Sequence, residues 1–197
     1  HYARLNTALT RGHARTRIAV IHPIESYWLL KGPAEHCAAA AQELDENFHT
    51  LTEWLIANNL DFDFISEALL PGQCPKGSAP LQVGAMAYDV VLVSGCRTLR
   101  RSTLERLSAF QNAGGRLLFL GGKPEWIDAQ PPTDEDRHFL NEMPLLPFSR
   151  MALINALDSY RDFWLRNEDG SPCQSYVAQL RQDGADRWLF LAPLAPP

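Results

Sequence analysis

Cys96 is the residue whose type and position best suit nucleophilic chemistry. It follows an apolar run at residues 88–94 and is followed directly by Arg97. A thiol becomes a good nucleophile when a base or a positive neighbour lowers its pKa, and Arg97 could supply that charge. No histidine is tied to Cys96 by a motif, and free cysteines are among the most often buried residues. We therefore expect a structural cysteine and keep a cysteine hydrolase as the minor alternative.

Glu25 and Trp28 follow an earlier apolar run, residues 17–22, in a segment that could bind a sugar. A carboxylate accepts hydrogen bonds from hydroxyls, and an indole can stack on a pyranose face. Because aromatic residues more often pack than bind, we favour the interpretation that Tyr27 and Trp28 cover the edge of a sheet. A carbohydrate-binding module remains the alternative.

Three further candidates follow the third apolar run, residues 116–120. Ligands of open α/β sheets bind beyond the carboxyl ends of the strands, so a small-molecule site would also draw on Lys123, Glu125 and Trp126. Glu25 and Glu125 could be neighbours there, but no pattern singles them out as the carboxylate pair of a glycosidase.

No metal or cofactor site is expected. His36 and Cys37 are adjacent on a predicted helix and point about 100° apart, and His22 with Glu25 has no further ligands at a useful spacing. The two glycines at 121 and 122 lack the longer pattern of a phosphate-binding loop and predict a tight turn.

The elements that would position these residues alternate between strands and helices. Apolar runs at 17–22, 88–94 and 116–120 are typical of strands buried on both faces, and residues 61–65 form a shorter strand pattern. Helices are predicted at 1–12, 33–59 (ending at Asn58 and Asn59), 102–113, 133–140 and 149–160, whereas 71–80 is a loop. Ser102 and Glu105 match a capping box at the start of the third helix, and Gly114 with Gly115 ends it.

Residues 161–197 follow a different pattern. Short strands are predicted at 162–166, 175–181 and 187–191, with turns at Gly170 and Gly184. This segment is expected to be antiparallel β structure, either an extension of the domain or the start of a following β-sandwich.

Composition narrows the range of functions. The chain has 197 residues and a formal net charge of −5, which argues against a nucleic-acid partner because phosphate binding needs clustered Lys and Arg. Without an apolar run near the ~18 residues of a membrane span or a signal-peptide pattern, no membrane partner is expected. We expect His1 and Pro197 to lie within a longer polypeptide, so cellular localisation is not predicted.

The run at residues 88–125, YDVVLVSGCRTLRRSTLERLSAFQNAGGRLLFLGGKPE, resembles the central strand–helix–strand of the class I glutamine amidotransferase-like fold. In that superfamily the second of these strands leads to a nucleophile elbow with a cysteine, and the resemblance places Gly121 at that position. The family's catalytic histidine lies later in the chain, where His138 has no matching strand context. The resemblance therefore implies that the amidotransferase chemistry is lost.

A degenerate form of this fold occurs in large glycoside hydrolases, and the chain resembles the β-galactosidase trimerisation domain. The resemblance is carried by YARLNTALTRG with RIAVIHP, by AGGRLLFLGG, and by the tail from DFWLRNEDG to YVAQLRQDGADRWLFLAP. In such enzymes the domain follows a catalytic (β/α)8 barrel and precedes a β-sandwich, and the catalytic carboxylates lie on the barrel. No catalytic residue of this chain follows from the resemblance.

Together these observations predict a flavodoxin-like, three-layer α/β/α domain with a mainly parallel sheet and a hairpin-rich C-terminal extension. Residues 1–160 would form the domain, with 1–12 as a linker helix from a preceding domain. The expected role is that of a non-catalytic accessory domain of a glycoside hydrolase. Its expected partners are other domains of the parent chain, further copies of itself, or carbohydrate.

Overall fold

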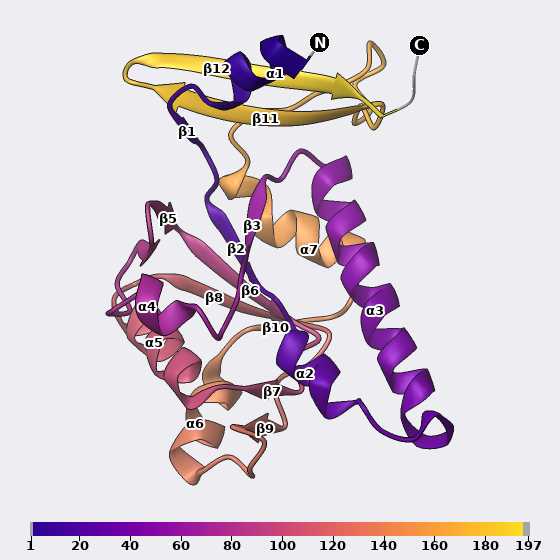
Figure 1. Ribbon diagram of the computed structural model, residues 1–197, viewed down its shortest axis with the longest axis vertical. Helices are drawn as coiled ribbons and strands as arrows, with labels where there is room; N and C mark the ends of the chain where they lie inside the picture. The colour runs from indigo at the N-terminus through magenta and orange to yellow at the C-terminus, as the bar shows by residue number, and fades with distance from the viewer. Residues whose placement is uncertain (1, 195–197) are drawn as a thin grey trace.

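The computed structural model describes residues 2–194, except for the side chains of Tyr2, Arg4 and Ala34, and its centre is a five-stranded parallel sheet (Figure 1). The strands are β2 (Ile18–Ile21), β3 (Phe62–Ile65), β6 (Val90–Ser94), β8 (Arg116–Leu120) and β10 (Leu145–Leu146). They lie in the order β10-β8-β6-β2-β3, and all four pairings are parallel. This confirms the predicted mixed α/β fold with a parallel sheet.

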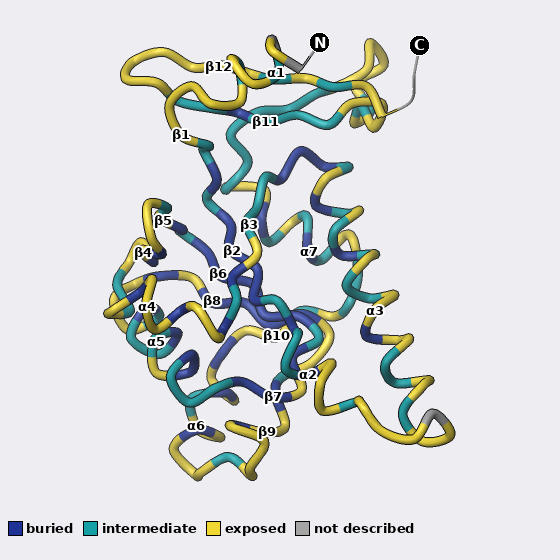
Figure 2. Tube along the Cα trace, in the orientation of Figure 1, coloured by how far each residue is buried: buried dark blue, intermediate teal, exposed yellow. Residues whose placement is uncertain are grey.

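Alternate residues of the central strands enter two separate hydrophobic clusters. Ala19 and Ile21 of β2 belong to one cluster, whereas Ile18 and Val20 belong to the other. Successive side chains of a strand point to opposite faces, so a strand apolar at every position needs cover on both. Figure 2 shows the resulting central band of buried strands.

Helices supply that cover. The cluster around Ile18 contains Leu51 and Leu55 of α3 (Ala34–Ala57) and Leu153 and Leu157 of α7 (Arg150–Leu157). The cluster around Ile21 contains side chains of α4 (Leu70–Gln73), α5 (Arg101–Asn112) and α6 (Asp134–Glu142). Helix α3 ends at Ala57 with Asn58 as its C-cap, as predicted, and Asn59 takes a left-handed φ of 53°.

The predicted capping box at Ser102 and Glu105 is wrong. The N-cap of helix α5 is Arg100, two residues before Ser102, and the helix has no side-chain cap from its own sequence neighbours. The backbone N–H of Arg100 instead donates to the Glu67 carboxylate at 2.8 Å, and that of Arg101 donates to Asp128 at 3.0 Å. Carboxylates brought in by the fold satisfy the free N–H groups, so a local box is not needed.

The other end of α5 is as predicted. Gly114 has a φ of 91°, and a Cβ on Gly115 would lie 2.1 Å from the Phe110 ring. The first glycine is needed for its conformation, and the second is needed for the close approach to Phe110.

Several short elements were not predicted from the sequence. They are α2 (Ile24–Leu29), the antiparallel pair β4 (Leu81–Val83) and β5 (Met86–Tyr88), the parallel pair β7 (Thr98–Leu99) and β9 (Trp126–Ile127), and strand β10. The residues expected to be loop also begin inside α4. Elements of two to six residues are too short to show a hydrophobic period.

The C-terminal part forms a second small sheet. Strands β11 (Tyr176–Asp183) and β12 (Asp186–Pro193) pair as a hairpin, and β1 (His13–Ala14) pairs with β11. Of the strand expected at 162–166, only Arg166 forms a bridge, with Pro172, and the remainder follows a 3-10 turn (Asp158–Tyr160) as irregular chain. Figure 1 shows this sheet and α1 (Tyr2–Leu9) at one end of the molecule, and α2, β7 and β9 at the other. Residue 1 of the predicted linker helix and residues 195–197 of the predicted extension lie outside the described residues.

Candidate functional site

A cleft of about 410 Å³ lies at the carboxyl ends of β6 and β8. The strand ends contribute two lining segments, residues 94–97 and 120–123. One wall is α3, through Ala40, Glu43, Leu44 and Asn47, and Leu30 and Phe148 complete the lining. The cleft therefore lies where open α/β sheets bind ligands.

The structure brings most of the predicted site residues together here. Cys96, Arg97, Lys123 and Glu125 all line the cleft. Trp126 lines an adjoining hollow of about 320 Å³, which shares Leu30, Arg97 and Glu125 with the first.

Glu25 and Trp28 line neither hollow. Trp28 lies on α2 and is 54% exposed, whereas the Glu25 side chain is only 14% exposed and pairs with the Arg100 guanidinium. Glu25 is therefore held by an ion pair and is poorly available to a ligand.

Ser26 of α2 links the segments that follow β2 and β6. Its buried hydroxyl accepts hydrogen bonds from the backbone N–H groups of Arg97 at 2.8 Å and Thr98 at 3.2 Å. The strand order changes direction at this point, which is where such sheets commonly bind ligands. The cleft described above lies one strand further along, at the carboxyl ends of β6 and β8.

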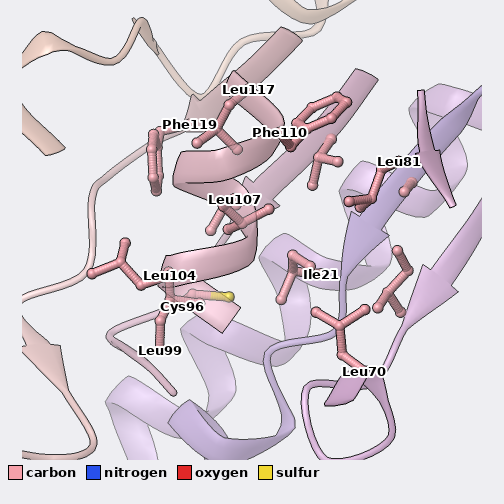
Figure 3. Close-up of a cluster of buried hydrophobic side chains, with 14 of the residues drawn as sticks. Ile21, Leu70, Leu81, Cys96, Leu99, Leu104, Leu107, Phe110, Leu117 and Phe119 are labelled. Carbon is pink, nitrogen blue, oxygen red and sulfur yellow. The ribbon is translucent and has the colours of Figure 1, made fainter. Parts of the chain in front are cut away.

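Cys96 lies at the junction of the cleft and the hydrophobic core. It is 5% exposed and belongs to the same cluster as Leu99 and Leu104, as Figure 3 shows. Burial first, and then the nearby carboxylates of Glu67 and Glu25, raise the pKa of its thiol well above the ordinary value. Among the described contacts its sulfur bonds only to the Ser94 carbonyl, at 3.7 Å. These surroundings suit a structural thiol and oppose formation of a thiolate.

Glu67 is a notable polar residue that sequence reasoning missed. It is 1% exposed, and burial raises the pKa of its carboxyl to about 7, while the hydrogen bond from the Arg100 N–H acts in the opposite direction. Nothing in the sequence around Glu67 distinguishes it from a surface glutamate, because its partner lies 33 positions away.

Gly121 occupies the cleft floor where β8 ends. Its φ is 80°, and its N–H donates to the Leu146 carbonyl at 2.9 Å. A Cβ at this position would lie 3.3 Å from Phe148. The position that the family resemblance assigns to the nucleophile therefore has a left-handed turn and no side chain.

Charge in the cleft is balanced. Arg97 and Lys123 supply two positive side chains, and Glu43 and Glu125 supply two negative ones. Within the described part of the chain, none of the four has an oppositely charged atom within 4.0 Å. Lys123 donates one hydrogen bond to the Asn141 carbonyl, at 3.2 Å.

His22 does not reach a metal-like cluster. Its ring packs edge-on against Phe48 and Phe64, and burial lowers its pKa. In residues 2–194, no three His, Cys, Asp or Glu side chains are grouped closely enough to hold a metal ion.

None of the described helices is long and apolar enough to cross a membrane.

A scan against protein-family models finds no match to this sequence, and a search of curated proteins finds no significant match.

Proposed function

We propose that this chain is a non-catalytic α/β domain of a larger carbohydrate-active protein, where it supports a neighbouring catalytic domain or subunit assembly. The observation that carries the proposal is that no histidine lines the described cleft and that its one cysteine, Cys96, is buried. The family resemblance assigns the nucleophile position to Gly121, which has no side chain, and the thiol of Cys96 is held in the core with a raised pKa. A covalent mechanism needs an activated nucleophile and a base within hydrogen-bond reach.

The proposal includes a finer description of the fold, namely a three-layer, glutamine amidotransferase-like domain with a hairpin-rich C-terminal extension. Counted along the chain, the five parallel strands lie in the order 2-1-3-4-5, which is the flavodoxin-like order. The two hydrophobic clusters on alternate strand residues also support it.

The small sheet supports an architectural role. Strand β12 lies at the edge of its sheet, and its apolar residues Trp188, Leu189 and Leu191 are each more than 40% exposed. Unpaired edges with apolar side chains invite pairing with another chain or domain. In the proposal these side chains contact another domain of the parent protein or a second subunit.

The proposal is tested on the sequence and the activity of the natural polypeptide that contains this chain. We expect its flanking sequence to contain a (β/α)8 pattern of about 250 residues, and we expect glycosidase activity to be abolished by substituting carboxylates on that barrel. The 197-residue chain alone is expected to hydrolyse neither aryl glycosides nor glutamine. Turnover by the chain alone that is lost in Cys96→Ser would overturn the proposal, as would a natural polypeptide without any further domain.

A further inference from the structure

The two hollows beside the strand ends form one continuous groove. They share Leu30, Arg97 and Glu125, so each opens onto the same middle segment. Phe148 lines only the first hollow, and Trp126 lines only the second. Phe148 and Trp126 therefore lie on either side of the shared segment, which carries the charged residues Arg97 and Glu125.

The charged groups of the groove suit hydroxyl groups better than ionic ligands. Arg97 and Lys123 are donors, and Glu43 and Glu125 are acceptors. A phosphate or a polyanion would meet two carboxylates, and a polycation would meet two positive side chains. Sugar hydroxyls both donate and accept, so a neutral sugar can use all four groups without burying an unmatched charge.

Apolar surface between these groups suits the faces of sugar rings. Leu44 of α3 and Phe148 line the first hollow, and Trp126, which is 39% exposed, offers part of its ring in the second. Indole and phenyl rings combine a large apolar face with defined geometry. Two hollows of about 410 and 320 Å³ provide more space than a single sugar unit needs.

We propose that this groove binds a neutral oligosaccharide chain of at least two units, with Arg97 and Glu125 contacting the sugar at its middle. The inference rests on the proposed function and deepens it by naming the ligand class. Bound in this way, a carbohydrate chain would be held at the end of the molecule opposite the small sheet, which stays free for a neighbouring domain (Figure 1).

Binding is tested on the 197-residue chain with cellotriose, maltotriose, mannotriose and galactotriose, and with the three corresponding monosaccharides, glucose, mannose and galactose. Saturation-transfer NMR detects binding, and isothermal titration calorimetry measures it. We expect at least one trisaccharide to bind about tenfold or more tightly than its monosaccharide, because a second unit adds contacts in the second hollow.

Gly122→Leu is the sharpest variant. Gly122 lines the cleft, has an ordinary φ, and a Cβ on it would meet no atom within 4 Å, so we expect a leucine there to occupy the groove without straining the backbone. Gly72→Leu is the matched control, because Gly72 has the same open surroundings away from the groove. We expect Gly122→Leu to abolish binding and Gly72→Leu to leave it unchanged.

Two variants that each remove a charge test the middle of the groove. Arg97→Gln and Glu125→Gln each remove one charged hydrogen-bonding partner and should weaken binding about tenfold. The matched controls are Arg116→Gln and Glu105→Gln, which change exposed residues outside the groove and should have no effect.

The inference is overturned if no trisaccharide of the panel binds, if monosaccharides bind equally well, or if Gly122→Leu binds like the wild type. Failure of the proposed function looks different. If the chain binds trisaccharides but its natural polypeptide has no glycosidase domain, the proposed function is wrong and the binding inference stands. If a glycosidase domain is present but no trisaccharide binds, only the binding inference is wrong.

Discussion

Glu67 and Cys96 are both buried beneath the carboxyl ends of the strands, where surroundings of low polarity penalise their charged forms. The carboxyl therefore titrates near neutral pH, and the thiol resists ionisation. The two effects reinforce each other, because a Glu67 carboxylate also raises the pKa of Cys96. At the scale of the residue, the reactivity of the Cys96 thiol depends more on its burial than on Arg97, its neighbour in the sequence.

We expect Cys96 to be unreactive toward iodoacetamide in the folded chain at neutral pH, because alkylation requires the thiolate. Cys37 and Cys173, which are partly exposed, should react first. Mass spectrometry of peptides after timed labelling measures each rate, and labelling in urea provides the control in which all four cysteines react. Rapid labelling of Cys96 under native conditions would instead support the cysteine hydrolase.

Glu67→Gln should become progressively more stabilising, relative to wild type, as pH rises. Unfolding returns the carboxyl from its raised pKa of about 7 to the ordinary value of 4.5, so the stability of the wild type falls as pH rises through this window. We expect the difference in free energy of unfolding between variant and wild type to grow by about 1–3 kcal/mol from about pH 5 to pH 8.5.

Urea unfolding at both pH values measures this difference. Glu105→Gln, at an exposed glutamate of α5, is the control and should show no comparable change. A difference for Glu67→Gln that does not vary with pH would contradict the burial argument.

At the scale of the element, α5 and α6 start in different ways. Helix α6 is capped by its own sequence, since the Thr133 hydroxyl and the Asp136 carboxylate complete a capping box. Asp136 also pairs with Arg101 of α5, with one bond at 2.8 Å, which holds the pKa of its carboxyl well below the ordinary value. Helix α5 depends on carboxylates from distant loops.

Thr133→Ala should lower the free energy of unfolding by about 1 kcal/mol, because the first turn of α6 loses its side-chain acceptor. Ser149→Ala is the matched control. Ser149 also occupies an N-cap position, that of α7, but its side chain makes no capping hydrogen bond. Chemical denaturation of both variants tests the prediction, and equal losses in the two variants would contradict it.

At the scale of the whole molecule, residues 161–165 connect the parallel sheet to the small one. Arg161 donates to the Asn58 carbonyl at 2.9 Å and stacks on Trp164 at 3.7 Å, and the Leu165 N–H donates to the Asn59 side chain at 2.9 Å. The link is therefore fixed to the end of α3, and irregular chain replaces the strand expected from sequence.

Arg161→Ala should cost about 2 kcal/mol of stability and accelerate proteolysis between residues 161 and 175, because a buried hydrogen bond and a stacking contact are lost. Arg166→Ala is the control. Arg166 also lies over Trp164, at 4.9 Å, but is exposed. Denaturation together with limited chymotrypsin digestion, which cuts after aromatic residues such as Phe163 and Trp164, measures both effects. A similar outcome for the two variants would show that Arg161 does not fix the link.

The amino-acid sequence by itself determined the central strands, the long helices and the hairpin turn at Gly184, because periodicity and turn chemistry are local properties of the chain. It also identified Arg97, Lys123 and Glu125, since residues that follow parallel strands gather at one edge of the sheet.

Only the tertiary structure decided which of these residues meet. In the folded chain Glu25 forms an ion pair with Arg100, and the Ser26 hydroxyl accepts a hydrogen bond from the Arg97 N–H. The first N–H groups of α5 donate to the carboxylates of Glu67 and Asp128. Each of these contacts joins residues 27 to 75 positions apart in the sequence. Local patterns carry no information about such pairs, because their energies arise only when the sheet has assembled and excluded water from them.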